Sequence, residues 1–103
     1  VQELLGRGVK PTGIIACDDL LAFGVIKHLN EIGLRVSEDI AVAGVNNVPL
    51  DEYFNPPLTS VDVNAFSLGA KAFELLLADM NKEYASINRA IVPAKLIVRK
   101  STI

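Results

Sequence analysis

Residues 13–24, GIIACDDLLAFG, contain the change of pattern that decides the fold. A short apolar run at 14–17 follows Gly13 and ends at two adjacent carboxylates, Asp18 and Asp19, and an apolar sequence with helical spacing comes next. The apolar run predicts a short buried strand, and the spacing after it predicts a helix over 20–32. The predicted strand therefore ends at the two carboxylates, and the predicted helix begins directly after them.

The next residues complete a strand–helix–strand unit. At about 100° per residue, one face of the helix carries Leu21, Val25, Leu29 and Ile32, with Ala22 and Ile26 beside it, and Gly33 ends it. Residues 40–45, IAVAGV, are continuously apolar, which is typical of a strand covered on both faces of a parallel sheet. The sequence thus predicts an α/β fold with a right-handed βαβ crossover.

The rest of the chain is interrupted by prolines. Residues 46–58 contain Pro49, Pro56 and Pro57 and predict a loop, and 59–63 predict a short extended segment. Asn64 is the expected N-cap of a helix over 65–81, more than half of whose surface we expect to be covered. Residues 81–88 predict a polar turn, and one or two short strands, broken at Pro93, follow.

Composition indicates a globular, water-soluble protein. The 103 residues suit one domain at most, half of them are hydrophobic, and no apolar run is long enough to cross a membrane. The net charge is −2 and the basic residues are scattered, which argues against a nucleic-acid surface on this chain. The one cysteine, Cys17, excludes an internal disulfide and suits a reducing compartment, so we expect a cytoplasmic protein.

The chain begins inside a structural element. Its first residue is not Met, and VQELLGRG predicts the last turns of a helix that ends at Gly6 or Gly8. We therefore expect a fragment of a longer protein.

Asp18 and Asn46 each follow the carboxyl end of a predicted strand. If the strands are parallel neighbours, both side chains emerge at the edge of the sheet where open α/β sheets bind ligands. We expect Asp19 to cap the helix and Asp18 to face the ligand crevice. The alternative is that both acids serve only as capping and turn residues and that Asn46-Asn47 is merely a turn.

Catalytic and metal-binding patterns are lacking. His28 has no second histidine or acid at ligand spacing, and Cys17 has no histidine placed to activate it. The chain also has no Gly-rich phosphate loop. We expect neither an enzyme nor a cofactor or metal. Leu20 and Phe23 fall outside the predicted core face of the helix, which favours a partner surface.

Three segments carry a resemblance to a known family. They are PTGIIACDDLLAFGVIKHLNEIGLRVSEDIAVAGVNNVPLDEYFNPPLTSV, LGAKAFELLL and AKLIVRKST. In this order they closely resemble the C-terminal part of the lactose-repressor (LacI/GalR) family of bacterial transcription regulators. The resemblance implies a two-lobe, type I periplasmic-binding-protein-like domain with a parallel, Rossmann-like sheet in each lobe. It assigns residues 1–61 to the C-terminal lobe, 62–92 to a crossover into the N-terminal lobe, and 93–103 to a returning strand.

The resemblance also implies partners. It places Asp18 and Asn46 at a small-molecule effector, and Leu20, Phe23, Tyr53 and Phe54 at a homodimer interface; DNA would be bound by a headpiece outside this chain. The family usually has Asp at the position of Asn46 and an aromatic residue at Val45. The resemblance implies a sugar or nucleoside-like effector, while these departures argue against a plain sugar or indicate a cleft with little effector dependence. A periplasmic solute-binding protein and an enzyme on a Rossmann-like sheet remain alternatives.

Overall fold

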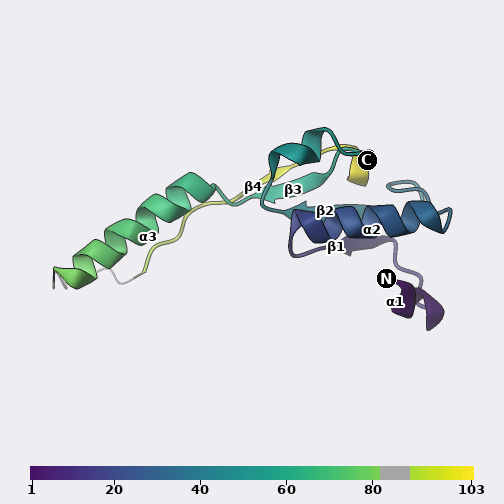
Figure 1. Cartoon of the computed structure of the whole chain (residues 1–103), viewed down its shortest axis with the longest axis horizontal. Helices are drawn as coiled ribbons and strands as arrows, with labels where there is room; N and C mark the ends of the chain where they lie inside the picture. The colour runs from purple at the N-terminus through teal and green to yellow at the C-terminus, as the bar shows by residue number, and fades with distance from the viewer. Residues whose placement is uncertain (82–88) are drawn as a thin grey trace.

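The computed structural model describes residues 1–81 and 89–103 and contains a four-stranded sheet (Figure 1). Its strands lie in the order β1-β2-β3-β4, with bounds Gly13–Ile15 for β1, Ala41–Val45 for β2, Thr59–Asp62 for β3 and Lys95–Ile97 for β4. The helices are α1 (Gln2–Gly6), α2 (Asp19–Glu31) and α3 (Ala65–Met80), with 3₁₀ turns η1 (Pro49–Glu52) and η2 (Lys100–Thr102).

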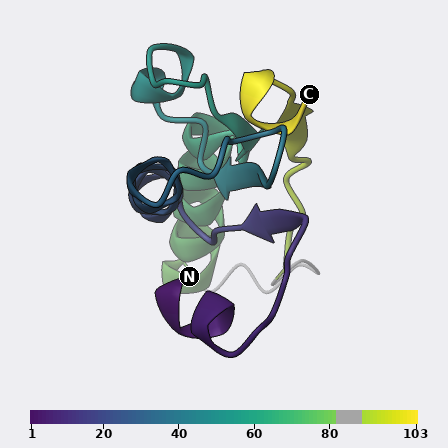
Figure 2. The same ribbon diagram turned by 90° about the vertical axis from the view of Figure 1, so that its right-hand side faces the viewer.

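The first three strands are parallel. Gly13 pairs with Ala41, and Ala43 pairs with Thr59, while β4 returns antiparallel to β3. The predicted parallel βαβ unit is therefore confirmed, and the α/β class with it. Figure 2 shows α1 beyond β1 at one side of the sheet, with η1 and η2 at the opposite side. Because β1, β2 and β3 are parallel, their carboxyl ends lie at the same edge of the sheet.

The core lies between α2 and one face of the sheet. Its fully buried side chains include Ile26 and Leu29 of α2, Val42 of β2 and Leu58 before β3. Along β2 buried and half-buried residues alternate, and Ile15 of β1 is 82% exposed. In the described residues, then, the sheet is covered on one face, whereas the continuous apolarity of 40–45 had predicted cover on both.

The predicted core face of α2 is partly wrong. Leu21 and Ile32 are exposed, whereas Ala22, Phe23 and Ile26 are buried. Both sides of this helix are apolar, so helical spacing alone could not choose between them. The side with Leu21 and Val25 borders an open groove next to Val1.

Helix α3 extends away from the sheet (Figure 1). None of its residues is buried, and Phe66, Phe73 and Met80 are each at least 60% exposed. The chain has a Cα radius of gyration of 18.2 Å, against about 13 Å for a compact domain of this size. The apolar side of α3, expected from its pattern to be covered, therefore has no cover within the part of the chain that the structure describes.

Asn64 occupies the N-cap position of α3, but its side chain makes no capping hydrogen bond and its backbone is left-handed, with φ of 54°. Asp62 instead accepts from the Asn64 amide at 2.8 Å. The expected cap position is therefore correct and the expected capping contact is wrong. The polar turn predicted at 81–88 lies, beyond Asn81, outside the described residues.

Candidate functional site

Asp18 and Asn46 meet at the carboxyl edge of the parallel strands. Asn46 Nδ2 donates to Asp18 Oδ2 at 2.8 Å, although the two residues are 28 positions apart. Asp18 is half-buried and Asn46 is exposed. The two polar side chains predicted to share this edge therefore touch each other.

The prediction that Asp19 caps the helix is wrong. Asp18, and not Asp19, is the N-cap of α2, and its Oδ1 accepts from the Leu20 amide at 2.8 Å. Asp19 lies in the first turn and is fully buried. Its side chain lies beneath the edge, where it contacts Ser60 and the Val48 amide.

Asp19 joins α2 to β3 and to the segment after β2. Its Oδ1 accepts from the Ser60 hydroxyl of β3 at 2.7 Å, and its Oδ2 accepts from the Val48 amide at 3.0 Å. A Cβ at position 44 would lie 2.2 Å from Asp19 Oδ1. The glycine in β2 thus provides the space that this buried carboxylate occupies.

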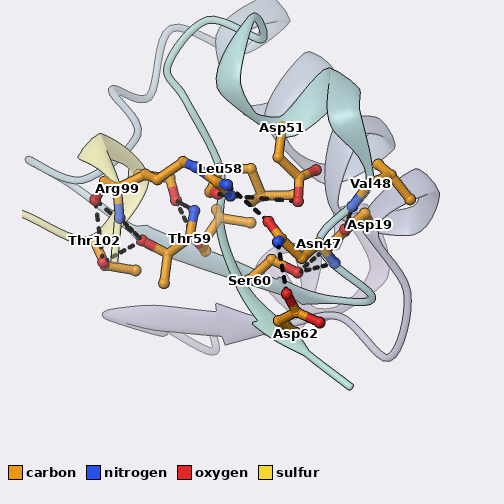
Figure 3. Close-up of polar contacts among 12 residues, drawn as sticks. Asp19, Asn47, Val48, Asp51, Leu58, Thr59, Ser60, Asp62, Arg99 and Thr102 are labelled. Atoms are coloured by element: carbon orange, nitrogen blue, oxygen red, sulfur yellow. Dashed lines mark hydrogen bonds and ion pairs between the residues drawn. The ribbon is translucent and has the colours of Figure 1, made fainter. Parts of the chain in front are cut away.

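Asn47 is held from three directions, as the close-up in Figure 3 shows. Its backbone amide donates to Ser60 Oγ at 2.9 Å, its Nδ2 donates to Asp62 Oδ2 at 3.1 Å, and its Oδ1 accepts from Arg99 Nη2 at 2.7 Å. Asn46 and Asn47 have φ values of 108° and 50°, a left-handed region in which asparagine is enriched. The pair therefore forms a fixed turn that presents Asn46 outward.

Arg99 continues this network below the edge. Its Nη1 donates to the Leu58 carbonyl at 2.7 Å and lies 3.5 Å from Asp51 Oδ2. Asp51 is fully buried and neither of its carboxyl oxygens accepts a hydrogen bond from the described residues. Burial, and then the neighbouring Asp19 carboxyl group, raise the pKa of Asp51 to about 7, against the opposing effects of Arg99 and Ser60.

Asp62 has the opposite electrostatic environment. The hydrogen bond from the Asn64 amide, together with the one from Asn47, holds the pKa of Asp62 below its usual value. This carboxylate therefore stays ionised beside Asn47 at neutral pH.

The outer edge of the sheet is rich in hydrogen-bond acceptors. A carboxylate has about four lone-pair positions, and the contacts with Leu20 and Asn46 use two of those of Asp18. The amide of Asn46 adds a carbonyl oxygen and a second N–H. Such an edge can bind a neutral polar molecule that carries hydroxyl or amine donors.

The residues predicted for a dimer surface divide into two pairs. Leu20 and Tyr53 are 71% and 79% exposed. Phe23 is 8% exposed and stacks on Phe54 with ring centroids 4.3 Å apart, so placing Phe23 outside the core was wrong. The loop at 46–58 folds back over α2 and covers that side of the helix.

Sequence reasoning missed the network beneath the edge. Asp51 and Arg99 lie in a loop and after a terminal strand, where charged residues are ordinary, and nothing in the pattern links them. Cys17 is exposed, and His28 Nε2 is buried with no hydrogen-bond partner among the described residues. Within the same residues, no group of three or more potential metal ligands occurs, and no helix is long and apolar enough to cross a membrane.

This geometry defines an α/β domain whose parallel strands end at one polar edge of the sheet. A family model described as "Periplasmic binding protein-like domain" matches residues 1–102. The "HTH-type transcriptional repressor PurR" of Pasteurella multocida is 35% identical over 103 residues, which are 98% of this chain and 30% of the relative. The "HTH-type transcriptional repressor CytR" of Escherichia coli K12 is 30% identical over 102 residues, which are 99% of this chain and 30% of the relative.

Solved structures of LacI regulators are also similar to this chain. The lac repressor dimer bound to operator and the anti-inducer ONPF has a TM-score of 0.87 at 30% identity, with 98% of this chain and 30% of that chain covered. A LacI regulator from Bacillus cereus subsp. cytotoxis has a TM-score of 0.90 at 37% identity, with 98% and 36% covered. The chain therefore belongs to the periplasmic binding protein-like family, in its lactose-repressor (LacI/GalR) branch. It spans about 30% of the length of the curated relatives it matches.

Proposed function

We propose that this chain is the effector-sensing and dimerisation part of a LacI-family transcription regulator. A small molecule bound between two lobes would control DNA binding by a separate headpiece. The contact between Asp18 and Asn46 at the carboxyl edge of β1 and β2 carries this proposal. Open α/β sheets bind ligands at this edge, and the acceptor-rich pair suits a sugar-related or nucleoside-like molecule.

The uncovered helix supports a second lobe. Residues 1–61 would form most of the C-terminal lobe, 62–92 would cross into the N-terminal lobe, and 93–103 would return. The excursion of α3 between the paired strands β3 and β4 supports this division. The exposed apolar side of α3 would pack inside the other lobe.

Names of related proteins support a regulator over the alternatives. The curated relatives are transcriptional repressors, and one similar structure, at TM-score 0.87 and 31% identity, is a "transcriptional regulator CelR-cellobiose complex". These relatives make the transporter-associated solute-binding protein and the Rossmann-like enzyme weaker hypotheses. The effector would act only through a difference in affinity between two lobe arrangements.

The dimer surface would include the exposed Leu20 and Tyr53 next to the stacked Phe23 and Phe54. In a twofold dimer one such patch meets its own copy. The structure of a relative described as a lac repressor dimer is consistent with this proposal.

Thermal stabilisation of the full-length regulator by a panel of sugars and nucleosides tests the effector site. Asp18→Ala and Asn46→Ala should abolish or strongly reduce the stabilisation by any hit. Glu31→Ala, which changes an exposed acid at the other end of α2, should leave it intact. Unchanged stabilisation in both edge variants would remove Asp18 and Asn46 from the site.

A further inference from the structure

Asn47 lies between the body of the sheet and the segment through which the chain leaves it toward α3. On the sheet side, its Oδ1 accepts from Arg99 Nη2 at 2.7 Å and its backbone amide donates to Ser60 Oγ at 2.9 Å. On the other side, its Nδ2 donates to Asp62 Oδ2 at 3.1 Å (Figure 3). The proposed effector contacts involve Asn46 and leave these contacts of its neighbour without a role.

Arg99 gives Asn47 a fixed support on the sheet. Its guanidinium also donates to the Leu58 carbonyl at 2.7 Å and lies 3.5 Å from the buried Asp51 carboxylate. Its backbone amide donates to Thr59 Oγ1 at 2.7 Å, and its side chain is 14% exposed. The Asn47 amide group is therefore oriented by a side chain that is itself held at several points.

Asp62, the last residue of β3, connects Asn47 to α3. Its Oδ1 accepts from the backbone amide of Asn64, the N-cap residue of α3, at 2.8 Å. Lys95, the first residue of the returning strand β4, is its Cα partner. One carboxylate thus has one oxygen on the turn at Asn46-Asn47 and the other on the start of α3, at the point where the chain departs and returns.

Position 47 requires a side chain that both donates and accepts. The Asp62 carboxylate only accepts and the Arg99 guanidinium only donates, whereas a primary amide can serve both at once. Asparagine also tolerates the left-handed backbone at this position, where φ is 50°. An aspartate here would still accept from Arg99, but it would place a second carboxylate against Asp62, and like charges repel.

We propose that Asn47 is a positioning residue, which fixes the direction in which the chain leaves the sheet for α3 and so sets the orientation of the second lobe relative to the effector turn. This inference rests on the proposed function, in which α3 belongs to that lobe. Asn46 directly precedes Asn47, so a ligand that reorients Asn46 would change the hold on Asp62. Coupling between two sites needs a physical element of this kind that both of them bias.

The test measures the separation of the two lobes in the full-length regulator by double electron–electron resonance, with no compound added. Spin labels are attached to cysteines introduced at Glu31 of α2 and Glu74 of α3, both exposed, after Cys17 and any other cysteine has been replaced by serine. Labelled protein is mixed with an excess of unlabelled protein, so that any dimer contains one labelled protomer. Asn47→Asp should broaden the distance distribution and shift its maximum, because Asp62 loses its side-chain donor.

Exchange of the two side chains tests the hydrogen bond itself. The double variant Asn47→Asp with Asp62→Asn keeps the composition and the net charge. Position 47 can then accept from Arg99 and from the amide at position 62, whose oxygen remains available to the Asn64 amide. The narrow distribution should return in this variant, which a loss of stability caused by the single change would not explain.

Two control variants separate positioning from charge and from stability. Asn30→Asp adds the same charge at an exposed site near the other end of α2, and Ile26→Val shortens a fully buried side chain of that helix. Both should leave the distance distribution unchanged. If Asn47→Asp does not fold, Asn47→Gly removes the side chain, suits the left-handed backbone and should broaden the distribution in the same way.

Unchanged distances in Asn47→Asp and Asn47→Gly, or an exchange variant as broad as Asn47→Asp, would overturn the positioning role. A distribution that is already broad in the unmodified regulator would contradict the second lobe around α3, and the positioning role with it. Because no compound is used, a failure of the effector site in the thermal screen leaves the distance measurement unaffected.

Discussion

Asn46 and Asp18 are joined by a 2.8 Å hydrogen bond across the ends of two adjacent parallel strands. The same carboxylate also receives the Leu20 amide and so begins α2. One side chain thereby connects the start of a helix with a surface turn. A molecule that competes for Asp18 would act on both.

Asp18→Ala should lower the free energy of unfolding by about 1 kcal/mol, because α2 loses its N-cap. Asp18→Asn should cost much less, since asparagine caps helices about as well as aspartate. Urea unfolding of the chain measures both. If the two variants are equally destabilised, the carboxylate matters for its charge or its contact with Asn46 and not for capping.

Gly44→Ala should destabilise the folded chain by about 1–3 kcal/mol, because the new Cβ would meet the buried Asp19 carboxylate, whose Oδ1 lies 2.2 Å from that position. Gly24→Ala is the matched control. Nothing lies within 4 Å of its added Cβ, and it sits inside α2. This variant should gain about 0.5–1 kcal/mol from helix propensity. Thermal unfolding that shows no difference between the two variants would contradict the close approach of Asp19 to β2.

Ser60→Ala should cost about 1–3 kcal/mol, because it removes a donor from the buried Asp19 and an acceptor from the Asn47 amide. The control is Ser67→Ala within α3, a helix with no buried residue, in which alanine favours the helix. Chemical denaturation of both variants makes the comparison. A neutral effect of Ser60→Ala would mean that Asp19 finds another donor.

Stability should depend on pH through Asp51. Its pKa is about 7 in the folded chain and about 3.9 when unfolded, so the folded state binds more protons between these values. The free energy of unfolding should therefore fall as pH rises from about 4 to about 7, by on the order of 1 kcal/mol per pH unit, and level off above. Asp51→Asn should remove this slope in unfolding curves recorded at several pH values.

Asp39 and Asp62 affect stability in a lower pH range than Asp51 does. Backbone hydrogen bonds lower the pKa values of Asp39 and Asp62, so their stabilisation is lost only as pH falls below the usual aspartate range, near pH 4. A slope between pH 4 and 7 that persists in Asp51→Asn would assign it to a different group.

Leu20→Asp should weaken self-association of the full-length regulator while leaving the unfolding free energy of the chain within about 0.5 kcal/mol, since Leu20 is 71% exposed. Phe23→Ala should instead cost about 3–5 kcal/mol, because its ring is buried against Phe54. Sedimentation velocity and urea unfolding separate the two effects. Unchanged association of Leu20→Asp would exclude this residue from the dimer surface.

The sequence was sufficient to predict the strands and the position of Asp18 and Asn46 at the same edge of the sheet. Both follow from short-range pattern and from the geometry of parallel strands. The division of roles between Asp18 and Asp19 did not follow, because either acid can cap a helix and only the space left by Gly44 shows which one is buried. The sequence pattern around Asp18 and Asp19 does not show that a glycine in a neighbouring strand leaves space for a side chain.

Contacts that depend on long separations were also missed. Phe23 is covered by a loop 31 residues away, at Phe54, and helical spacing contains no information about that loop. Arg99 reaches Asn47 across 52 residues. The amphipathic pattern of α3 predicted cover that the described residues do not supply.

Asp62 and Lys95 are Cα partners at the last step of the β3–β4 ladder, so the polypeptide departs and comes back at neighbouring points. Everything between them is topologically an insertion. A two-residue reverse turn of the Asn-Gly type could close this gap, because such turns match the twist of antiparallel strands. The shortened polypeptide would keep all four strands and the capped α2, and would lose the exposed apolar residues of α3. It would be a minimal scaffold in which the stability of the sheet and of the buried Asp19 and Asp51 can be measured without α3.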